Sequence, residues 1–530
     1  MTAIHDCEFL SFGDSLFLYL EREGTPLNIA SLAIFDGDIS AKELRDLVAS
    51  KLNQIPRYMQ RVIVPPLNVG VPYWEFAADF RLERHIREIV LKRGTTAELK
   101  AATSEVLSPT MDRQHPLWDL TLIRGLKGSR TAMIARVHHC MADGISGMGL
   151  MNLLMDASPA VPATKHRRIR VPHTKDGNGT YLVNSAMQSW FSTLERLLQA
   201  GSEMLTLFQR ATGISDGGTA ETAIATNGLR KLGKEQVVRV AAELAELPQR
   251  LPFNVLCHGP QRYEWTETRL DDFKALRGTC GATVNDAILT VLTAAFRDYS
   301  ALHGLHPRGR SIRIVVPMST RRHHSDGLGN HITFAPFSAP LGIRNSRKLL
   351  GAIHERMEFV KTARVAEFVS FAGTLLGTIP TPLQAVLAPI ISELPISVCN
   401  TICTNVPGPK HPLYMLGHEM ISAYPYVPIG GEMGINCAVL SYNGTVYFGF
   451  TGDVTAAPDL EKLPKFVDLN IAELLRSAGV PRSHDRKAKA STTAKEFPPN
   501  IAAQAEPIAP QSEPKPMAKA AAAGAASTAA

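Results

Sequence analysis

The segment that most restricts the fold is VHHCMADGISG, residues 137–147. Directly before it, TAMIARV at 131–137 has the composition of a buried strand, and the run from Gly147, GMGLMNLLMD, has helical spacing. We therefore predict a strand, a loop at 138–146 and a helix. Both histidines then lie where the strand ends, and loops in such places often carry functional residues.

Length, composition and net charge restrict the class of protein. The chain has 530 residues, of which 45% are hydrophobic and 20% charged, so it is a mostly folded protein with two or three domains. Its formal net charge is +7. This balance suits a surface that meets anionic phosphates or lipid headgroups, but it lacks the dense basic stripe that nucleic-acid binding requires. We expect no nucleic-acid partner.

Cysteine usage and the first residues indicate the compartment. Seven cysteines without a C-x-x-C pair predict neither a disulfide framework nor a zinc knuckle. The start, MTAIHDCEFLSFGDSLF, carries acidic residues where a secretory peptide would carry basic ones. A cytoplasmic protein is expected. The uncharged stretch at 368–392 is long enough to span a bilayer, but its prolines and glycines argue against a spanning helix.

The chain divides into four predicted parts. Residues 1–160 alternate helical and strand-like patterns and form the N-terminal lobe with the histidine motif. Residues 161–228 form a linker whose apolar positions at 187–208 predict a long helix, either packed on the core or lying on a lipid surface. Residues 229–480 form the C-terminal lobe, with a helix at 286–299 and strands at 312–317 and 445–451. The Ala/Pro-rich remainder, 481–530, is predicted to be disordered.

The histidine motif, His-His-x-x-x-Asp-Gly, predicts acid–base chemistry. A neutral imidazole on a loop can accept a proton from a hydroxyl or thiol, which makes His139 the candidate general base. Asp143 can hold the loop through an ion pair or backbone hydrogen bonds, and Gly144 allows the chain to turn into the helix. The predicted catalytic set is His138, His139 and Asp143.

Other readings of the same residues fit less well. Adjacent side chains on an extended segment point in opposite directions, and no H-E-x-x-H spacing occurs, so we expect no metal. A nucleophile elbow needs a glycine where Met148 stands, which leaves Ser146 as a helix-start residue. Neither a dinucleotide fingerprint nor a P-loop occurs nearby, and no cofactor is predicted.

Over residues 8–475 the chain resembles the bacterial wax ester synthase/diacylglycerol acyltransferase family, a branch of the CoA-dependent acyltransferase superfamily. The histidine motif fits the whole superfamily, including condensation domains, whereas the other marks in this order point to the lipid branch. Those marks are SFGDSLFLYLE with PLNIASLAIF, MDRQHPLWDL at 111–120, ATVNDAIL at 282–289, VPMSTR at 316–321, TNVPGP at 404–409 and PIGGEMGINCAVLSYNGTVYFG at 428–449. The shorter echo RRHHSDG at 321–327 does not keep the motif spacing, and we interpret it as a loop.

The resemblance implies an α/β fold with two chloramphenicol-acetyltransferase-like lobes, mixed sheets and an active-site channel between the lobes. It further implies His139 as base, acyl-CoA as a co-substrate, and diacylglycerol or a long-chain alcohol as acceptor. The product would be triacylglycerol or wax ester. We also expect peripheral contact with a membrane or with lipid inclusions.

The supporting segments provide candidate substrate contacts, each with a structural alternative. Asn285 can cap the helix that follows, or Asn285 or Asp286 can face His139 across the channel. Trp118 is either core packing or channel wall. The turn at 407–409 is rigid in itself, but it can also hold backbone donors at a site. The predicted substrate-binding set is Gly144, Asn285, Asp286, Trp118, Asn405 and Gly408. Arg321 and Arg322 are candidates for pairing Asp143 or CoA phosphates.

Two rival functions remain open at this point. A condensation enzyme would use carrier-bound acyl groups, although the chain has no evident carrier domain. A non-catalytic coat of lipid inclusions would use the apolar segments at 187–208 and 368–392, but it would leave the histidine motif without a purpose.

Overall fold

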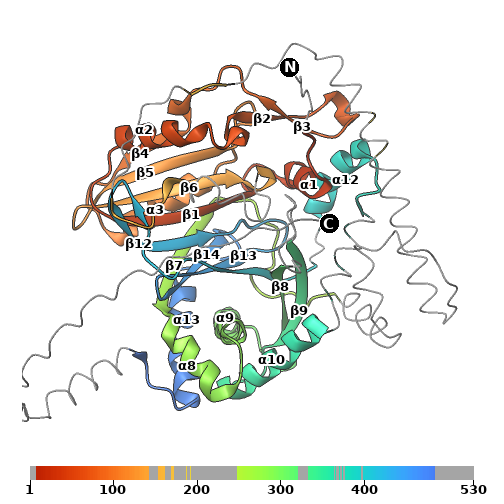
Figure 1. Ribbon diagram of the computed structural model, residues 1–530. Coiled ribbons are helices and arrows are strands. Elements are labelled where there is room, and N and C mark those ends of the chain that lie inside the picture. Colours follow the sequence, from red (N-terminus) through yellow and green to blue (C-terminus); the bar gives the residue numbers. More distant parts are fainter. Residues whose placement is uncertain are drawn as a thin grey trace, which may run out of the picture. The chain divides into compact units, whose positions relative to one another are not determined.

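Two six-stranded mixed sheets form the framework of the protein (Figure 1). The computed structural model describes residues 8–141, 153–160, 169–171, 187, 191, 247–319, 332–362, 365, 369, 373, 376–394 and 398–483. The described residues belong to one compact unit. The predicted lobe and linker boundaries stay predictions, and the predicted tail lies outside the described residues from residue 484 on.

The first sheet has the order β11-β12-β1-β6-β5-β4. β4 and β5 are parallel, and the other neighbours are antiparallel. The strands span β11 Tyr414–Met415, β12 His418–Tyr426, β1 Asn28–Asp36, β6 Arg130–His138, β5 Trp118–Leu126 and β4 Ile86–Val90. β6 confirms the predicted strand at 131–137. It is buried from Thr131 to His138, because both faces of the sheet are covered.

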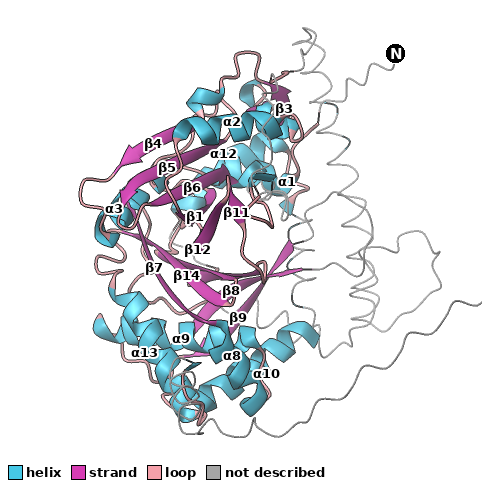
Figure 2. Ribbon diagram, turned by 60° about the vertical axis from the view of Figure 1, so that its left-hand side comes forward, coloured by secondary structure: helices cyan, strands magenta, loops and turns pink. Residues whose placement is uncertain are grey.

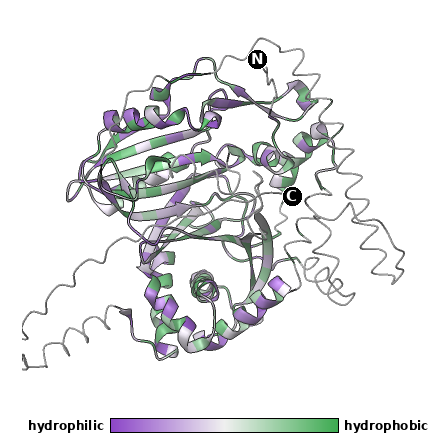
Figure 3. Cartoon of the chain, viewed as in Figure 1, coloured by the Kyte–Doolittle hydropathy of each residue, from purple (hydrophilic) through white to green (hydrophobic). Residues whose placement is uncertain are grey.

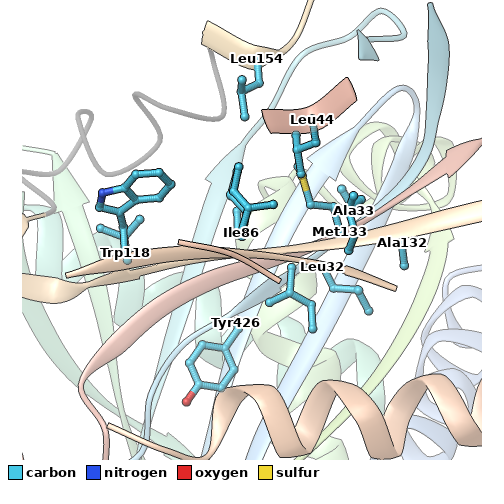
Figure 4. Packing of buried hydrophobic residues seen from close by; sticks show 14 of the residues in the cluster. Leu32, Ala33, Leu44, Ile86, Trp118, Ala132, Met133, Leu154 and Tyr426 are labelled. Carbon is cyan, nitrogen blue, oxygen red and sulfur yellow. The ribbon is translucent and has the colours of Figure 1, made fainter. Parts of the chain in front are cut away.

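The two faces of the first sheet have different neighbours. On one face, Ala33 and Met133 meet Leu44 of α2, Ala41–Leu52, while Leu32 and Tyr426 point to the other side (Figure 4). Figure 3 colours the strands of this sheet as largely hydrophobic. The second face meets α3, Thr96–Leu107, and strands of the second sheet. The histidine motif therefore ends a strand that lies between two packed layers.

The second sheet has the order β7-β14-β13-β10-β8-β9, with β10 parallel to β13 and β8. Its strands are β7 Gln261–Arg269, β14 Thr445–Asp453, β13 Ile435–Tyr442, β10 Thr401–Pro407, β8 Ser311–Ser319 and β9 Ile332–Pro340. Four helices cover the face turned away from the first sheet: α8 Leu270–Cys280, α9 Val284–Leu302, α10 Ser346–Thr362 and α13 Lys462–Ser477 (Figure 2). β8 and β14 confirm the predicted strands at 312–317 and 445–451.

The sheets pack against each other through strand faces. The core of the first sheet includes Tyr263, Tyr442 and Tyr447 from the second. Gly449 shows how close the layers come, since a Cβ at this position would lie 2.0 Å from the Pro425 carbonyl oxygen. β11 and β12 follow β10 in the chain, yet they pair with the first sheet. The sequence did not predict that these two strands join the first sheet.

α9 confirms the predicted helix at 286–299 and corrects its cap. The N-cap is Thr283, whose hydroxyl accepts from the Asp286 backbone N–H while the Asp286 carboxylate accepts from the Thr283 N–H. The alternative that Asn285 caps the helix is wrong, because the Thr-x-x-Asp box that begins two residues earlier satisfies the first N–H groups. Asn285 lies inside the first turn.

Several shorter elements lie outside the two large sheets and their helices. α1 is Phe12–Leu20 and α12 is Thr381–Glu393, and the two helices pack together. A small sheet pairs β2 Gln60–Ile63 with β3 Tyr73–Phe76. The described residues also include four 3₁₀ turns, labelled η1 to η4, which span Pro56–Met59, Pro66–Asn68, Leu82–Arg84 and His139–Met141.

Within the described ranges, no single helix is both long and apolar enough to cross a membrane, and α8 with α9 passes that test only as a pair bent by 105°. α12 accounts for part of the uncharged stretch at 368–392. The predicted helix at 187–208 lies outside the described residues except at positions 187 and 191, both helical.

Candidate active site

The histidine motif begins at the last residue of β6. His138 ends the strand, and its backbone N–H donates to the Leu117 carbonyl at 2.9 Å. His139 starts the 3₁₀ turn η4, and its backbone N–H donates to the Leu27 carbonyl at 2.9 Å. The change from strand to turn therefore occurs between the two histidines and sends their side chains into different surroundings.

The His139 ring is partly exposed and stacks on Phe17 of α1. The ring centroids are 3.7 Å apart and the planes differ by 15°. The Nδ1 atom is buried, and among the described residues no other side chain bonds to it. Burial is the main reason that the pKa of His139 is lowered to about 4. The backbone of His139 itself raises this pKa, and the neighbouring His138 lowers it. The imidazole is therefore neutral near pH 7, as a general base must be.

His138 is fully buried and is held from two sides. Its Nδ1 accepts from the Cys140 backbone N–H at 3.1 Å, which assigns the proton of the neutral ring to Nε2. Nε2 lies 3.3 Å from the Glu21 carboxylate. The ring is thus held by a hydrogen bond at Nδ1, while Nε2 lies within ion-pair distance of a carboxylate without meeting hydrogen-bond geometry. This arrangement suits an anchor for the turn better than a group that reacts with substrate.

Glu21 is the carboxylate behind the motif. Its side chain is only 2% exposed, and it accepts from the Leu27 backbone N–H at 3.0 Å and from Arg113 at 3.1 Å. Burial would raise the pKa of Glu21, but the neighbouring His138 imidazole, the Leu27 N–H and the Arg113 guanidinium lower it below its usual range. The carboxylate is therefore ionised beside the two histidines.

Trp118 lies on the other face of the first sheet from Tyr426 (Figure 4). It is 2% exposed, its indole N–H donates to the Tyr58 carbonyl at 2.7 Å, and its ring stacks on His85 at 4.5 Å. Since the second sheet packs on the Tyr426 side, these contacts favour the core-packing alternative for Trp118. They do not support a place on a channel wall between the lobes.

The second lobe brings two predicted substrate residues together. Asn405 of β10 donates through Nδ2 to Oδ1 of Asn285 in α9 at 3.0 Å. These residues come from segments 120 positions apart, so the structure joins the Asn-Asp and Asn-Val-Pro-Gly-Pro marks into one site. Within the described residues, no hydrogen bond links this pair to His139.

Asp286 and Gly408 have structural reasons for their identity. Asp286 is fully buried, closes the cap of α9 and accepts from His354 Nδ1 at 2.8 Å. A Cβ at Gly408 would lie 2.4 Å from the Ser441 carbonyl oxygen, and the Gly408 N–H donates to that same oxygen at 2.8 Å. These contacts favour a supporting role for both residues over the predicted contact with substrate.

Several predicted residues lie outside the described part of the chain: Asp143, Gly144, Ser146, Arg321, Arg322, His323 and His324. Among the residues that are described, Cys140 follows the histidines directly, but burial raises the pKa of its thiol well above the usual range, which argues against a cysteine nucleophile. The described ranges contain no group of three or more His, Cys, Asp or Glu residues able to hold a metal.

A cavity of about 460 Å³ lies near the opposite end of β6. Arg130, Trp265 and Tyr424 are among its lining residues, and none of the predicted site residues is. Eight residues of strand separate Arg130 from His138, which corresponds to roughly 26 Å. This cavity is therefore separate from the histidine site.

Sequence reasoning missed Phe17, Glu21 and Arg113 as parts of the site. All three lie in segments that mark the family, SFGDSLFLYLE and MDRQHPLWDL, but an acidic residue beside Arg22 at the end of a helix looks like an ordinary exposed charge. The available signal was the i, i+4 spacing of Phe17 and Glu21, which places both on one side of a helix.

Comparison with solved structures defines the class of protein. The chain is similar to a wax ester synthase/diacylglycerol acyltransferase from Marinobacter aquaeolei VT8, with a TM-score of 0.61 and 23% identity over 89% of this chain and 100% of that one. It is also similar to the first condensation domain of the calcium-dependent antibiotic synthetase, with a TM-score of 0.51 and 13% identity over 90% and 98% of the two chains. These similarities confirm the α/β fold with mixed sheets, shared by acyltransferases and condensation domains.

Sequence comparison then selects the branch. Residues 10–288 match the wax ester synthase/diacylglycerol acyltransferase catalytic domain, and residues 328–474 match the C-terminal domain of the same family. A probable diacylglycerol O-acyltransferase of Mycobacterium tuberculosis is 27% identical over 85% of this chain and 91% of its own length. A second from that organism is 23% identical over 88% and 98%. The chain belongs to the wax ester synthase/diacylglycerol acyltransferase family, and it is an acyltransferase.

Proposed function

We propose that the protein transfers a fatty acyl group from acyl-CoA to the hydroxyl of diacylglycerol or of a long-chain alcohol, with His139 as the general base. The observation that carries this proposal is the state of His139, a partly exposed ring at a strand end whose pKa is lowered to about 4 by burial. Such a ring is unprotonated in neutral solution and can take up a hydroxyl proton.

The reaction balances without a covalent enzyme intermediate. His139 accepts the hydroxyl proton as the alcohol oxygen bonds to the thioester carbonyl carbon, which gives a tetrahedral oxyanion. The carbon–sulfur bond then breaks, and the imidazolium returns its proton to the CoA sulfur. General base catalysis supplies roughly 10²–10⁴-fold of the rate. Placement of the two substrates and stabilisation of the oxyanion supply the rest.

The amide pair of the second lobe is a candidate for substrate contact. Because Asn405 donates to Oδ1 of Asn285, the Asn285 amide is fixed with its Nδ2 group as a remaining donor. An amide donor suits an ester or thioester carbonyl, or the oxyanion formed from it. We assign this role to Asn285, with Asn405 as its support.

A lipid surface is the proposed location of the acceptor. α12 exposes Leu383, Val386, Ile390 and Ile391 at 48–59%, and η2, which contacts α12, exposes Leu67 at 87%. Exposed apolar residues gathered in one place are typical of interaction surfaces. They support peripheral contact with membranes or lipid inclusions from the cytoplasmic side. Flotation with vesicles tests this contact, and V386K/I390K should abolish flotation while L469K on α13, which also replaces an exposed leucine, should not.

Product analysis tests the activity itself. Labelled palmitoyl-CoA is incubated with diacylglycerol and hexadecanol in competition, and in a parallel reaction a carrier-bound acyl donor replaces the CoA ester. We expect labelled triacylglycerol or wax ester from the CoA donor, its loss in folded H139A, and its retention in H411A, which replaces an exposed histidine. Ester formation only from the carrier would favour a condensation enzyme. Vesicle binding with no transfer to any alcohol would favour a coat protein.

A further inference from the structure

α1 touches both histidines of the motif from one side. Phe17 stacks on His139, and Glu21, which caps the C-terminal end of the helix, approaches His138 at 3.3 Å. The four-residue spacing places the two side chains one turn apart on the same face. A single helix thus supports the histidine assigned as base and the one before it.

Groups from three different parts of the chain face Glu21, and two of them donate hydrogen bonds to it. Oε1 accepts from the Leu27 backbone N–H at 3.0 Å and faces His138 Nε2, and Oε2 accepts from Arg113 at 3.1 Å. Arg113 also donates to the Leu18 carbonyl at 2.7 Å, which ties it to α1. A carboxylate that is 2% exposed requires such donors, because an unpaired buried charge is very costly. The ionised group is therefore built into this position.

Leu27 connects Glu21 with the turn that carries the base. Its N–H donates to Glu21, and its carbonyl accepts from the His139 backbone N–H at 2.9 Å. Two routes therefore lead from the carboxylate to His139. One passes through the ring of His138 to the Cys140 N–H, and the other passes through the main chain of Leu27.

We propose that Glu21 is a positioning residue, which holds the proton of His138 on Nε2 and through His138 and Leu27 fixes the turn η4, so that His139 faces the substrates in one orientation. This inference rests on the proposed role of His139 as base. Glu21 itself makes no contact with the reacting atoms.

The relation to His138 allows a specific test. Steady-state kcat and KM for palmitoyl-CoA and the lipid acceptor are measured for E21A, E21Q, E21D, H138A and the double variant E21A/H138A, with thermal unfolding of each. E23A is the matched control, because Glu23 is an exposed glutamate two residues away. We expect E21A to lower kcat by about 10²-fold, since small misplacement of a catalytic group has effects of this size, with KM little changed.

The substituted side chains separate hydrogen bonding from charge. Gln keeps an oxygen that can accept from His138 and Leu27, and Arg113, which would then face the amide NH2, keeps the Leu18 carbonyl as its acceptor, so E21Q should retain kcat within about threefold. Asp keeps the charge but is one methylene shorter, so E21D should lose more activity than E21Q. The double variant should lose clearly less than the product of the two single losses, because part of the effect of Glu21 passes through His138, and the remaining difference from H138A measures the route through Leu27.

Wild-type kcat in folded E21A, or single effects that multiply in the double variant, would overturn the proposal. If E21A does not fold, the test is the kcat of E21Q compared with the kcat of E21D. A higher kcat for E21D would refute positioning by hydrogen bonds. All of these variants are compared with the activity of the wild-type protein, so they test only the role of Glu21. A wild-type protein that transfers no acyl group to any alcohol would instead refute the proposed function.

Discussion

Two regions of the molecule each carry a pair of adjacent polar residues from the family marks: His138 and His139 at the end of β6, and Asn285 and Asp286 at the start of α9. In both pairs one residue is fully buried and held by internal partners. The other has fewer partners, namely the stack of His139 on Phe17 and the bond of Asn285 to Asn405. Each pair therefore combines a residue that holds the backbone with one that is available for chemistry.

The two regions differ in how the buried residue of each pair, Asp286 or His138, is fixed. Asp286 is held mainly by its own helix cap, a local contact three residues away. His138 is held by a carboxylate that lies far away in the sequence. A local cap forms whenever the helix forms. The contact between Glu21 and His138 exists only when α1 packs beside β6, so the alignment of the base depends on the tertiary structure of the whole lobe.

The largest expected effect separates the two histidines. H139A should lower kcat by about 10²–10⁴-fold, because it removes the base, with little change in thermal stability. H138A should lower the free energy of unfolding, because it removes the buried imidazole that faces the Glu21 carboxylate at 3.3 Å. Enzyme kinetics and thermal unfolding of both variants check this. Equal activity losses with equal stability would contradict the division of roles.

The next effect separates Asn285 from Asp286. D286A should destabilise the protein by about 2 kcal/mol, because it removes the cap of α9 and the partner of His354. N285A should leave stability nearly unchanged and lower kcat about tenfold or more through the lost amide donor. Denaturant unfolding and kcat are measured side by side. A stability loss confined to N285A would reverse the assignment.

Phe17 should have a smaller effect. F17L keeps an apolar side chain of similar size but loses the flat face that stacks on His139 at 3.7 Å. We expect kcat to fall about threefold to tenfold, since the ring gains freedom to rotate while its donors and acceptors are retained. F12L, at another phenylalanine of α1, is the comparison variant. Identical kinetics of F17L and wild type would show that the stack does not orient the base.

The smallest expected change concerns pH. An ordinary histidine with a pKa near 6.5 would be about nine-tenths protonated at pH 5.5, whereas His139, with its pKa lowered to about 4, stays neutral there. Since the neutral form is the active one, kcat should stay nearly constant from pH 7.5 to 5.5 and fall only toward pH 4. A pH–rate profile of the stable protein checks this. An acid limb near pH 6.5 would show that the ring is solvated in the reacting state.

Elements with a strong local pattern were predictable. The apolar run at 131–137, the helical pattern at 286–299 and the predicted strand at 445–451 correspond to β6, α9 and β14. The cap of α9 was assigned to the wrong residue because Asn285 and Thr283 are both good N-caps. Only the hydrogen bonds distinguish them.

The candidate site was predictable in part. The motif identified His139, and the marks ATVNDAIL and TNVPGP contained two residues that the structure brings together, Asn285 and Asn405. The supporting residues Glu21, Arg113 and Phe17 could not be assigned roles, because each acts on a partner that is distant in the sequence. Trp118 illustrates the reverse case, since only its place on the sheet face away from Tyr426 favours core packing.

The amino-acid sequence by itself determined the candidate base and single strands and helices, because short motifs and hydrophobic periodicity are local properties. The family and the α/β fold followed from the resemblance that its motifs carry. Only the tertiary structure decided that β12 joins the first sheet, that Asn285 meets Asn405, and that Glu21 lies buried against His138. Those contacts form between segments that come together only when the layers pack, and their strength depends on burial that no local pattern reveals.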